Sequence, residues 1–499
     1  MKKQMLFVRF VTLTLICAML TVSFVGCLYE EDEKQETGRT EQSGETTPGQ
    51  FQEICGGWLE DDLYLAPKFD RVVSVLGEES QKTQYLGEGK ESPDVVLRVV
   101  FQRNERVQER LGITFAWTHK PGGPDSIDLF VQEVETVIKG GTGLDATVCY
   151  SLVPQVLAQK GMAANLYGRK YLDLSAPWWP SAYMEEMTVN NTLYSLVEAN
   201  DYGLLKGLTA MFFHSEMLEA RGLESPYTLV KDNEWDIAKL SELIKDTYED
   251  TNSNAGADVD GDTFGYCAAT DNRMDAWLFG LGYRLSKLSK NNEKDILVSN
   301  VNAGYFQPYI DTMVTFFHSK SVCASDTEPH KMFLEERVCF YSADLRLINS
   351  IKSKELKIKY GMVPMPKLDK TQERYYTHPA DTYDAWCIPV SAPDFDCVSA
   401  VLECMASESY RNVGPIFLEQ YVQNRLAPNV MLEEMGYLLQ DSVTFDYFRL
   451  YSYGLNKNPE DLITSCITDP TENRWASIYS ANELILNDAF DKIAVLYSK

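Results

Sequence analysis

Strand-like and helix-like segments alternate along the first part of the main body of this chain. Residues 95–101, 113–117 and 144–150 are rich in β-branched and aromatic residues, which predicts strands. Residues 104–111, 127–138 and 151–160 carry apolar residues at helical spacing, which predicts helices, and Gly140-Gly141 ends the second of these. Such an order of elements is typical of an α/β fold. The body of about 450 residues exceeds what one core usually fills, so two lobes are expected.

This α/β order also predicts where a ligand would bind. In open α/β sheets, ligands bind in the crevice outside the carboxyl ends of the strands. Tyr150 closes the predicted strand 144–150 and Ser151 follows it. We therefore expect both residues to face a ligand.

The N-terminus has the pattern of a secretory signal. Lys2, Lys3 and Arg9 precede an apolar stretch that ends in Phe24-Val25-Gly26-Cys27. This end resembles the bacterial lipobox, which implies cleavage after residue 26 and acylation of Cys27 by palmitate or a similar chain. The alternatives are an ordinary signal peptide or a transmembrane anchor. We expect residues 1–26 to be a signal peptide and residues 27–56 to be a disordered acidic tether, with the protein lipid-anchored on the extracellular face of the cell membrane.

Charge and cysteine content narrow the functional classes. The formal net charge is −27, so the surface repels phosphate backbones and a nucleic-acid partner is not expected. Cys17 leaves with the signal and Cys27 is the lipidation candidate, and the remaining nine of the eleven cysteines contain no Cys-x-x-Cys pair. Cys397 and Cys404 lie seven residues apart in one predicted helix, which favours buried thiols over disulfides or metal ligands.

Several short motifs along the body follow a familiar order. They are Gly143-Leu144-Asp145-Ala146 with residues 158–166, residues 190–196, Met211-Phe212-Phe213-His214, residues 225–230 with Glu234-Trp235, and residues 359–367 with Gln372 and Tyr375. Each motif is short and degenerate, and the weight lies in their collinear order. In this order the chain resembles the extracellular solute-binding proteins of bacterial ABC importers, in the carbohydrate-type (family 1) lipoprotein branch.

The resemblance implies a two-lobed periplasmic-binding-protein-like α/β fold of type II, with the lobes joined by a hinge. Residues 57–197 and 374–424 would form lobe 1, and residues 198–373 and 425–499 would form lobe 2. The implied function is capture of a mono- or oligosaccharide between the lobes and its delivery to ABC transporter permease subunits. The partners would be the carbohydrate, the permease and the membrane through the lipid anchor, and the protein would be a monomer.

Sugar binding needs flat apolar rings for stacking and carboxylates or amides for hydroxyl groups. Residues of these types stand where the resemblance places the cleft. The candidate ligand-binding residues are Tyr150, Asp201, Trp277, Tyr341, Trp386 and Trp475. For each aromatic residue, a place in the packed core explains the sequence equally well. A separate motif, residues 177–180 (Pro-Trp-Trp-Pro), is interpreted as a structural surface loop.

One acidic loop suggests a structural calcium ion. Oxygen-bearing side chains stand at loop positions 1, 3, 5, 9 and 11, which is EF-hand-like spacing: Asp250, Asn252, Asn254, Asp258 and Asp260. The loop departs from that pattern because Ala255 replaces Gly at position 6 and Gly261 replaces Glu at position 12. A solvated acidic turn is the alternative. No other cofactor is expected.

Enzymatic functions find little support in the sequence. It contains no Gly-x-Ser-x-Gly, His-Glu-x-x-His or Gly-x-x-x-x-Gly-Lys motif, so we expect no enzyme. A surface glycoside hydrolase with carboxylates such as Glu198 and Asp201 is the rival hypothesis. A surface adhesin, a sensor's ligand-binding accessory, or a binding lipoprotein for a non-sugar solute are further alternatives.

Overall fold

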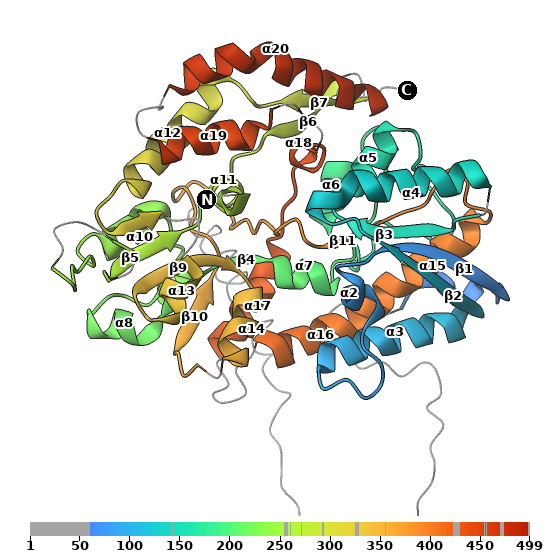
Figure 1. Ribbon diagram of the computed structural model, residues 1–499, viewed down its shortest axis with the longest axis horizontal. Coiled ribbons are helices and arrows are strands. Elements are labelled where there is room, and N and C mark those ends of the chain that lie inside the picture. Colours follow the sequence, from blue (N-terminus) through green and yellow to red (C-terminus); the bar gives the residue numbers. More distant parts are fainter. Residues whose placement is uncertain are drawn as a thin grey trace, which may run out of the picture. The chain divides into compact units, whose positions relative to one another are not determined.

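The computed structural model describes residues 60–497 except 142, 254–257, 260, 271, 292–293, 325–328, 355, 423–429, 454, 456 and 470–473. All of them belong to one compact unit, Glu53–Lys499. The predicted signal peptide, Cys27 and the predicted tether lie outside the described residues. Two sheets organise this unit, and we call the parts built around them the first and second lobes (Figure 1).

The first lobe contains a four-stranded sheet in the order β11-β3-β1-β2. Strands β1 (Arg71–Glu78), β2 (Ile113–Lys120) and β3 (Ala146–Tyr150) are parallel, and β11 (Asp384–Cys387) joins β3 in antiparallel register, with Tyr150 opposite Asp384. The sequence analysis placed the second and third of these strands correctly and did not identify β1. Helices of this lobe are α2 (Lys82–Leu86), α3 (Val95–Leu111), α4 (Ile127–Gly140), α5 (Val153–Gln159), α6 (Ser181–Met187) and α15 (Phe395–Glu408).

The second lobe contains a five-stranded sheet in the order β10-β4-β9-β5-β8. Strand β5 (Phe264–Ala268) runs parallel to β8 (Val322–Ala324) and to β9 (Val338–Asp344), whereas β4 (Thr209–His214) is antiparallel to β9 and to β10 (Tyr360–Val363). A hairpin of β6 (Ser286–Asn291) and β7 (Lys294–Ser299) lies outside this sheet.

The second lobe also contains many helices, among which α12, α19 and α20 contact one another. The helices of this lobe are α8 (Ser215–Ala220), α9 (Pro226–Lys231), α10 (Ile237–Ile244), α11 (Asp275–Gly280), α12 (Ala303–Phe317), α13 (Pro329–Leu334), α14 (Arg346–Ser353), α17 (Val430–Asp441), α18 (Tyr447–Leu450), α19 (Pro459–Thr468) and α20 (Trp475–Ala494). The mixed α/β architecture confirms the predicted fold class.

The chain crosses between the lobes at three places, one of them between α15 and α17, and the other two crossings are paired. Residues 196–209, which include helix α7 (Tyr202–Gly207), run beside residues 378–386. At one end Leu196 and Trp386 exchange both backbone hydrogen bonds, at 2.9 and 2.8 Å, and at the other the Ala380 N–H donates to the Gly207 carbonyl at 2.8 Å. We call these the hinge segments. The predicted lobe boundaries themselves stay predictions.

The predicted strand at residues 95–101 is wrong, because these residues form the first two turns of helix α3. The Asp94 carboxylate caps the helix by accepting from the N–H groups of Val96 and Leu97, at 2.9 and 3.1 Å. The buried positions 96, 97, 100, 103, 104, 107 and 111 follow helical spacing along the whole segment. The Asp94 cap and the helical spacing of apolar residues over the whole segment favour a helix more strongly than the β-branched residues favour a strand.

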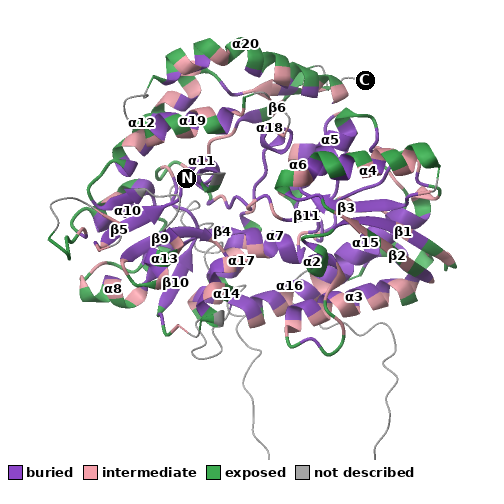
Figure 2. Ribbon diagram, viewed as in Figure 1, coloured by how far each residue is buried: buried purple, intermediate pink, exposed green. Residues whose placement is uncertain are grey.

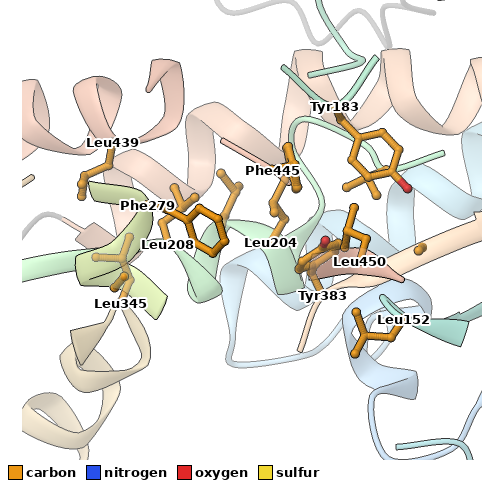
Figure 3. Close-up of a cluster of buried hydrophobic side chains, with 14 of the residues drawn as sticks. Leu152, Tyr183, Leu204, Leu208, Phe279, Leu345, Tyr383, Leu439, Phe445 and Leu450 are labelled. Carbon is orange, nitrogen blue, oxygen red and sulfur yellow. The ribbon is translucent and has the colours of Figure 1, made fainter. Parts of the chain in front are cut away.

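A continuous apolar core joins the two lobes. Strands β4 and β10 are buried throughout (Figure 2). The core continues through the hinge, where side chains from both lobes and from the C-terminal segment meet (Figure 3). There the ring of Phe445 lies 4.9 Å from that of Tyr183 and 6.0 Å from that of Tyr383. The lobes therefore share buried apolar side chains.

Two further predictions from the sequence can be compared with the structure. Cys397 and Cys404 are buried thiols on α15, as predicted, and all eight cysteines within the described residues are buried and none forms a disulfide. Residues 177–180 have a structural role but are not a surface loop, since both indole rings are buried and donate to the Glu403 carboxylate at 2.9 and 3.1 Å. No helix within the described residues is both long and apolar enough to span a membrane.

Candidate solute-binding site

A cavity lies where strand β9 ends beside the second hinge segment. It has a volume of about 40 Å³. We call it the hinge cavity, and its lining residues are Thr209, Arg273, Asp275, Ala276, Ser342, Ala343, Asp344, His378, Ala380 and Asp381. Strand β9 delivers Asp344 at its carboxyl end, and the chain after β5 delivers Arg273 and Asp275. The cavity thus occupies the edge of the sheet at which α/β proteins bind ligands.

Arg449 organises the charged groups beside this cavity. Its guanidinium donates to Asp275 at 2.9 Å and to Asp381 at 2.5 Å, and its Nε lies 3.3 Å from the Glu460 carboxylate. All four side chains are at least nine-tenths buried. The ion pairs hold these four side chains in place. Removing one partner would leave a buried charge without compensation, which is strongly destabilising.

The pKa values of the carboxyl groups around Arg449 reflect their burial. Burial raises the pKa of Asp275 to about 6, although Arg449 opposes the shift. Burial also raises the pKa of Glu460 to about 8, again against the effect of Arg449 and with Asp275 adding to the rise. One guanidinium therefore does not fully compensate the surrounding carboxylates.

Two other groups of the hinge cavity are placed by their neighbours. Arg346 donates to the Asp344 carboxylate at 2.8 Å and to the Thr382 carbonyl at 3.2 Å, which joins the end of β9 to the second hinge segment. The His378 ring lies 4.5 Å from that of Phe279, and its buried Nδ1 has no hydrogen-bond partner within the described residues. Burial lowers the pKa of His378, with nearby Arg449 acting in the same direction, so the neutral ring can exchange hydrogen bonds with a ligand.

A second cavity shares Asp275 and Arg449 with this region. It has a volume of about 470 Å³, and we call it the α19 cavity. Its lining residues are Thr270, Asp275, Arg449, Asn458, Glu460, Asp461, Thr464, Ser465 and Thr468. Neither cavity is lined by a described Phe, Tyr or Trp residue. Recognition in both cavities would therefore depend on hydrogen bonds and charge.

The first lobe reaches the hinge cavity through the end of strand β3. The Ser151 hydroxyl donates to the Asp381 carbonyl at 2.5 Å. Tyr150 is buried, and its pKa is raised by burial and by the Asp381 carboxylate while Arg449 and Arg346 oppose the rise. Both residues thus lie beside the second hinge segment, and neither lines a described cavity.

The other predicted ligand-binding residues are also buried, and none of them lines the hinge cavity or the α19 cavity. The Trp277 indole donates to the Tyr266 hydroxyl at 2.8 Å, and that of Trp475 donates to the Asn302 carbonyl at 3.0 Å. Tyr341 lies within β9, and the Trp386 ring lies 6.4 Å from that of Trp117. Their ligand-binding role stays a prediction.

Asp201 and Glu198, the carboxylates considered for hydrolysis, have structural partners. Asp201 caps helix α7 by accepting from the Leu204 N–H at 2.6 Å. Glu198 accepts from Arg103 at 3.3 Å and from the Ser409 hydroxyl at 2.6 Å. Burial raises the pKa of Asp201 to about 7, and the Glu198 charge contributes to the rise. Both residues therefore have an evident role in holding the first hinge segment.

The proposed calcium loop is only partly described. Asn254 and Asp260 lie outside the described residues. Asp250 accepts from the Ser253 N–H at 2.6 Å, and Asp258 accepts from the Asn252 amide at 2.8 Å. No group of three or more His, Cys, Asp or Glu residues within the described part of the chain could hold a metal ion. The calcium site stays a prediction.

A set of side-chain contacts also joins the lobes away from the hinge. The Asn190 amide of the first lobe donates to the carbonyls of Asp295 and Tyr497, at 2.9 and 3.0 Å, and accepts from the Asp295 N–H at 2.8 Å. The Tyr194 ring lies 5.5 Å from that of Tyr497. We call this contact the latch. It ties the turn at residues 189–192 to the β6–β7 hairpin and to the C-terminal end of the described chain.

Sequence reasoning missed most of the site. Asp275, Asp381, Arg449 and Glu460 are common residue types at distant positions, and only their contacts distinguish them from surface charges. Asp275 and Asp344 stand next to residues that had been singled out, Trp277 and Tyr341, but no spacing pattern links them to Arg449.

Comparisons with known proteins bear on the fold. No protein-family model and no curated protein matches this sequence. Among solved structures, the chain is similar to an extracellular solute-binding protein from Staphylococcus aureus in complex with maltose, with 12% identity and a TM-score of 0.52 over 85% of this chain and 96% of that one. The unliganded RafE from Streptococcus pneumoniae has 14% identity and a TM-score of 0.50 over 86% of this chain and 98% of that one.

A third similar structure is UspC from M. tuberculosis, with 14% identity and a TM-score of 0.50 over 84% of this chain and 100% of that one. Identities of this size bear on the fold and not on the ligand. Together with the two sheets and the paired hinge segments, they confirm the fold that the collinear motifs implied. The chain has the two-lobed fold of the extracellular solute-binding proteins.

Proposed function

We propose that this protein is a solute receptor that captures a carbohydrate between its two lobes and delivers it to the permease of an ABC transporter. The observation that carries the proposal is the hinge cavity, which brings the Arg273 guanidinium and the carboxylates of Asp344 and Asp381 together beside the paired hinge segments. Carboxylates accept hydrogen bonds from sugar hydroxyl groups and guanidinium groups donate to them. The solved structures of similar fold include one in complex with maltose.

The receptor would bind without reacting. Glu198 and Asp201, the pair considered for hydrolysis, are engaged with Arg103, Ser409 and the start of α7. Closure of the lobes would then follow from contacts that exist only when the cavity is occupied.

One experiment distinguishes binding of a saccharide from its enzymatic turnover. The protein is incubated with a panel of mono- and oligosaccharides, its melting temperature is recorded, and the mixtures are examined for products. We expect one saccharide class to raise the melting temperature without product. A ligand at 100 times its Kd should stabilise the fold by about 2.7 kcal/mol. Product formation, or no response to any saccharide, would contradict the proposal.

The membrane anchor rests on the N-terminal sequence alone. In the proposal, Cys27 is acylated and residues 27–56 tether the lobes to the outer face of the membrane. Feeding cells an alkyne fatty acid should label the wild-type protein, and Cys27→Ser should remove the label while Cys55→Ser should not. Labelling that survives Cys27→Ser would contradict the anchor.

A further inference from the structure

The α19 cavity offers many hydrogen-bond acceptors. The Ser465 hydroxyl donates to the Leu462 carbonyl at 2.8 Å and the Thr468 hydroxyl donates to the Thr464 carbonyl at 3.0 Å, so the protons of both groups are used within α19. What these hydroxyl groups can present to a ligand is their lone pairs. The buried Oδ1 of Asn458 adds another acceptor, without a hydrogen-bond partner within the described residues.

Among the acceptors of the α19 cavity, Glu460 gives the most information about the ligand. Its side chain is 7% exposed, and neither carboxylate oxygen has a hydrogen-bond partner in the described part of the chain. Its nearest cation is Arg449, at 3.3 Å, which already donates to Asp275 and Asp381. A buried carboxylate without donors is costly, so this side chain suits a ligand that brings donors.

The charges around Glu460 also favour a ligand that brings hydrogen-bond donors. Arg449 is surrounded by the buried carboxylates of Asp275, Asp381 and Glu460, while Asp461 lies exposed at the cavity rim and Asp446 also acts on Glu460. Burial raises the pKa of Glu460, the Asp275 and Asp446 charges add to the rise, and Arg449 opposes it. A bound cation would compensate these negative charges, whereas a second carboxylate would not.

We propose that the α19 cavity binds the protonated amine of an amino-bearing saccharide, with Glu460 as its carboxylate partner. An ammonium group carries three donors, no acceptor and one positive charge, which complements this lining on both counts. Polar residues of the neighbouring hinge cavity, such as Asp381, would accept hydrogen bonds from hydroxyl groups of the same ligand. This inference rests on the proposed carbohydrate-binding function and narrows it to amino sugars.

The test compares matched disaccharides by titration calorimetry at pH 6.5. The probes are the β-1,4-linked glucosamine disaccharide, its N-acetylated form and cellobiose. We expect the wild-type protein to bind the amine at least tenfold more tightly than either neutral probe. Glu460→Gln keeps the shape of the side chain and should remove this preference, whereas Asp488→Asn, at an exposed position of α20 outside both cavities, should retain it.

A second variant covers the case in which Glu460→Gln fails to fold. Thr468→Lys places an ammonium group on the cavity face of α19, away from the Arg449 network, and should abolish the preference for the amine. Equal affinity for the three probes, or a preference that survives both variants, would overturn the amino-sugar inference and leave carbohydrate binding intact. Failure of every saccharide to bind would overturn the proposed function as well.

Discussion

The latch offers a sharp quantitative test of how the two lobes are held together. Asn190→Gly removes three side-chain hydrogen bonds, those to the Asp295 and Tyr497 carbonyls and from the Asp295 N–H. Each such bond contributes about 0.5 to 1.5 kcal/mol net, so we expect the free energy of unfolding to fall by about 2 to 4 kcal/mol. Glycine is the right replacement because Asn190 has a φ of 49°, which other side chains rarely adopt.

The neighbouring residue supplies a matched control. Asn191 has a φ of 59°, is exposed, and its side chain makes no hydrogen bond with a described residue. Asn191→Gly therefore carries the same change in chain flexibility without the loss of contacts, and we expect its effect to stay below about 1 kcal/mol. Urea unfolding followed by far-UV circular dichroism measures both variants. Equal losses in the two variants would refute the latch.

Three further predictions concern buried charges and the acidic loop. Arg449→Met leaves the buried carboxylates without their cation and should lower the free energy of unfolding by about 3 to 5 kcal/mol in urea; a loss below about 1 kcal/mol would contradict the network. Burial raises the pKa of Glu403 to about 8, so its contribution to stability is present in full at acidic pH and is lost as the pH rises through 8. Urea unfolding at pH 5, 7 and 9 should show this decline in the wild type, and a similar decline in Glu403→Gln would exclude Glu403 as its source. Calcium should raise the melting temperature of the chelator-treated protein by a few degrees and that of Asp250→Asn by less; no response in the wild type would remove the calcium site.

The fold was accessible from sequence because its signals are local and repeated. Strand β3 and helix α4 follow from short periodic patterns, and Gly141 ends α4 with a φ of 66°. The misassigned segment shows the limit of such patterns. Residues 95–101 are β-branched, yet the Asp94 cap and the apolar spacing that continues to Leu111 determine a helix.

The site was less accessible because its members meet only in three dimensions. Asp275 and Arg449 are separated by 174 positions and belong to α11 and α18. Aromatic residues next to strand ends satisfy the same sequence pattern whether they stack on a ligand or fill the core, and Trp277 and Trp475 are buried among other rings. Sequence patterns therefore indicated which segments lie near the cavities, but not which charged residues line them.

The apolar cluster at the hinge has a consequence for how the protein can be divided. Leu152 and Tyr183 come from the first lobe, Phe279 and Leu345 from the second, and Phe445 from the C-terminal segment, and they belong to one buried cluster (Figure 3). Either lobe expressed alone would lack part of its hydrophobic core, since each lobe would expose apolar surface that the other covers. Heat or denaturant should accordingly melt the molecule in one cooperative step.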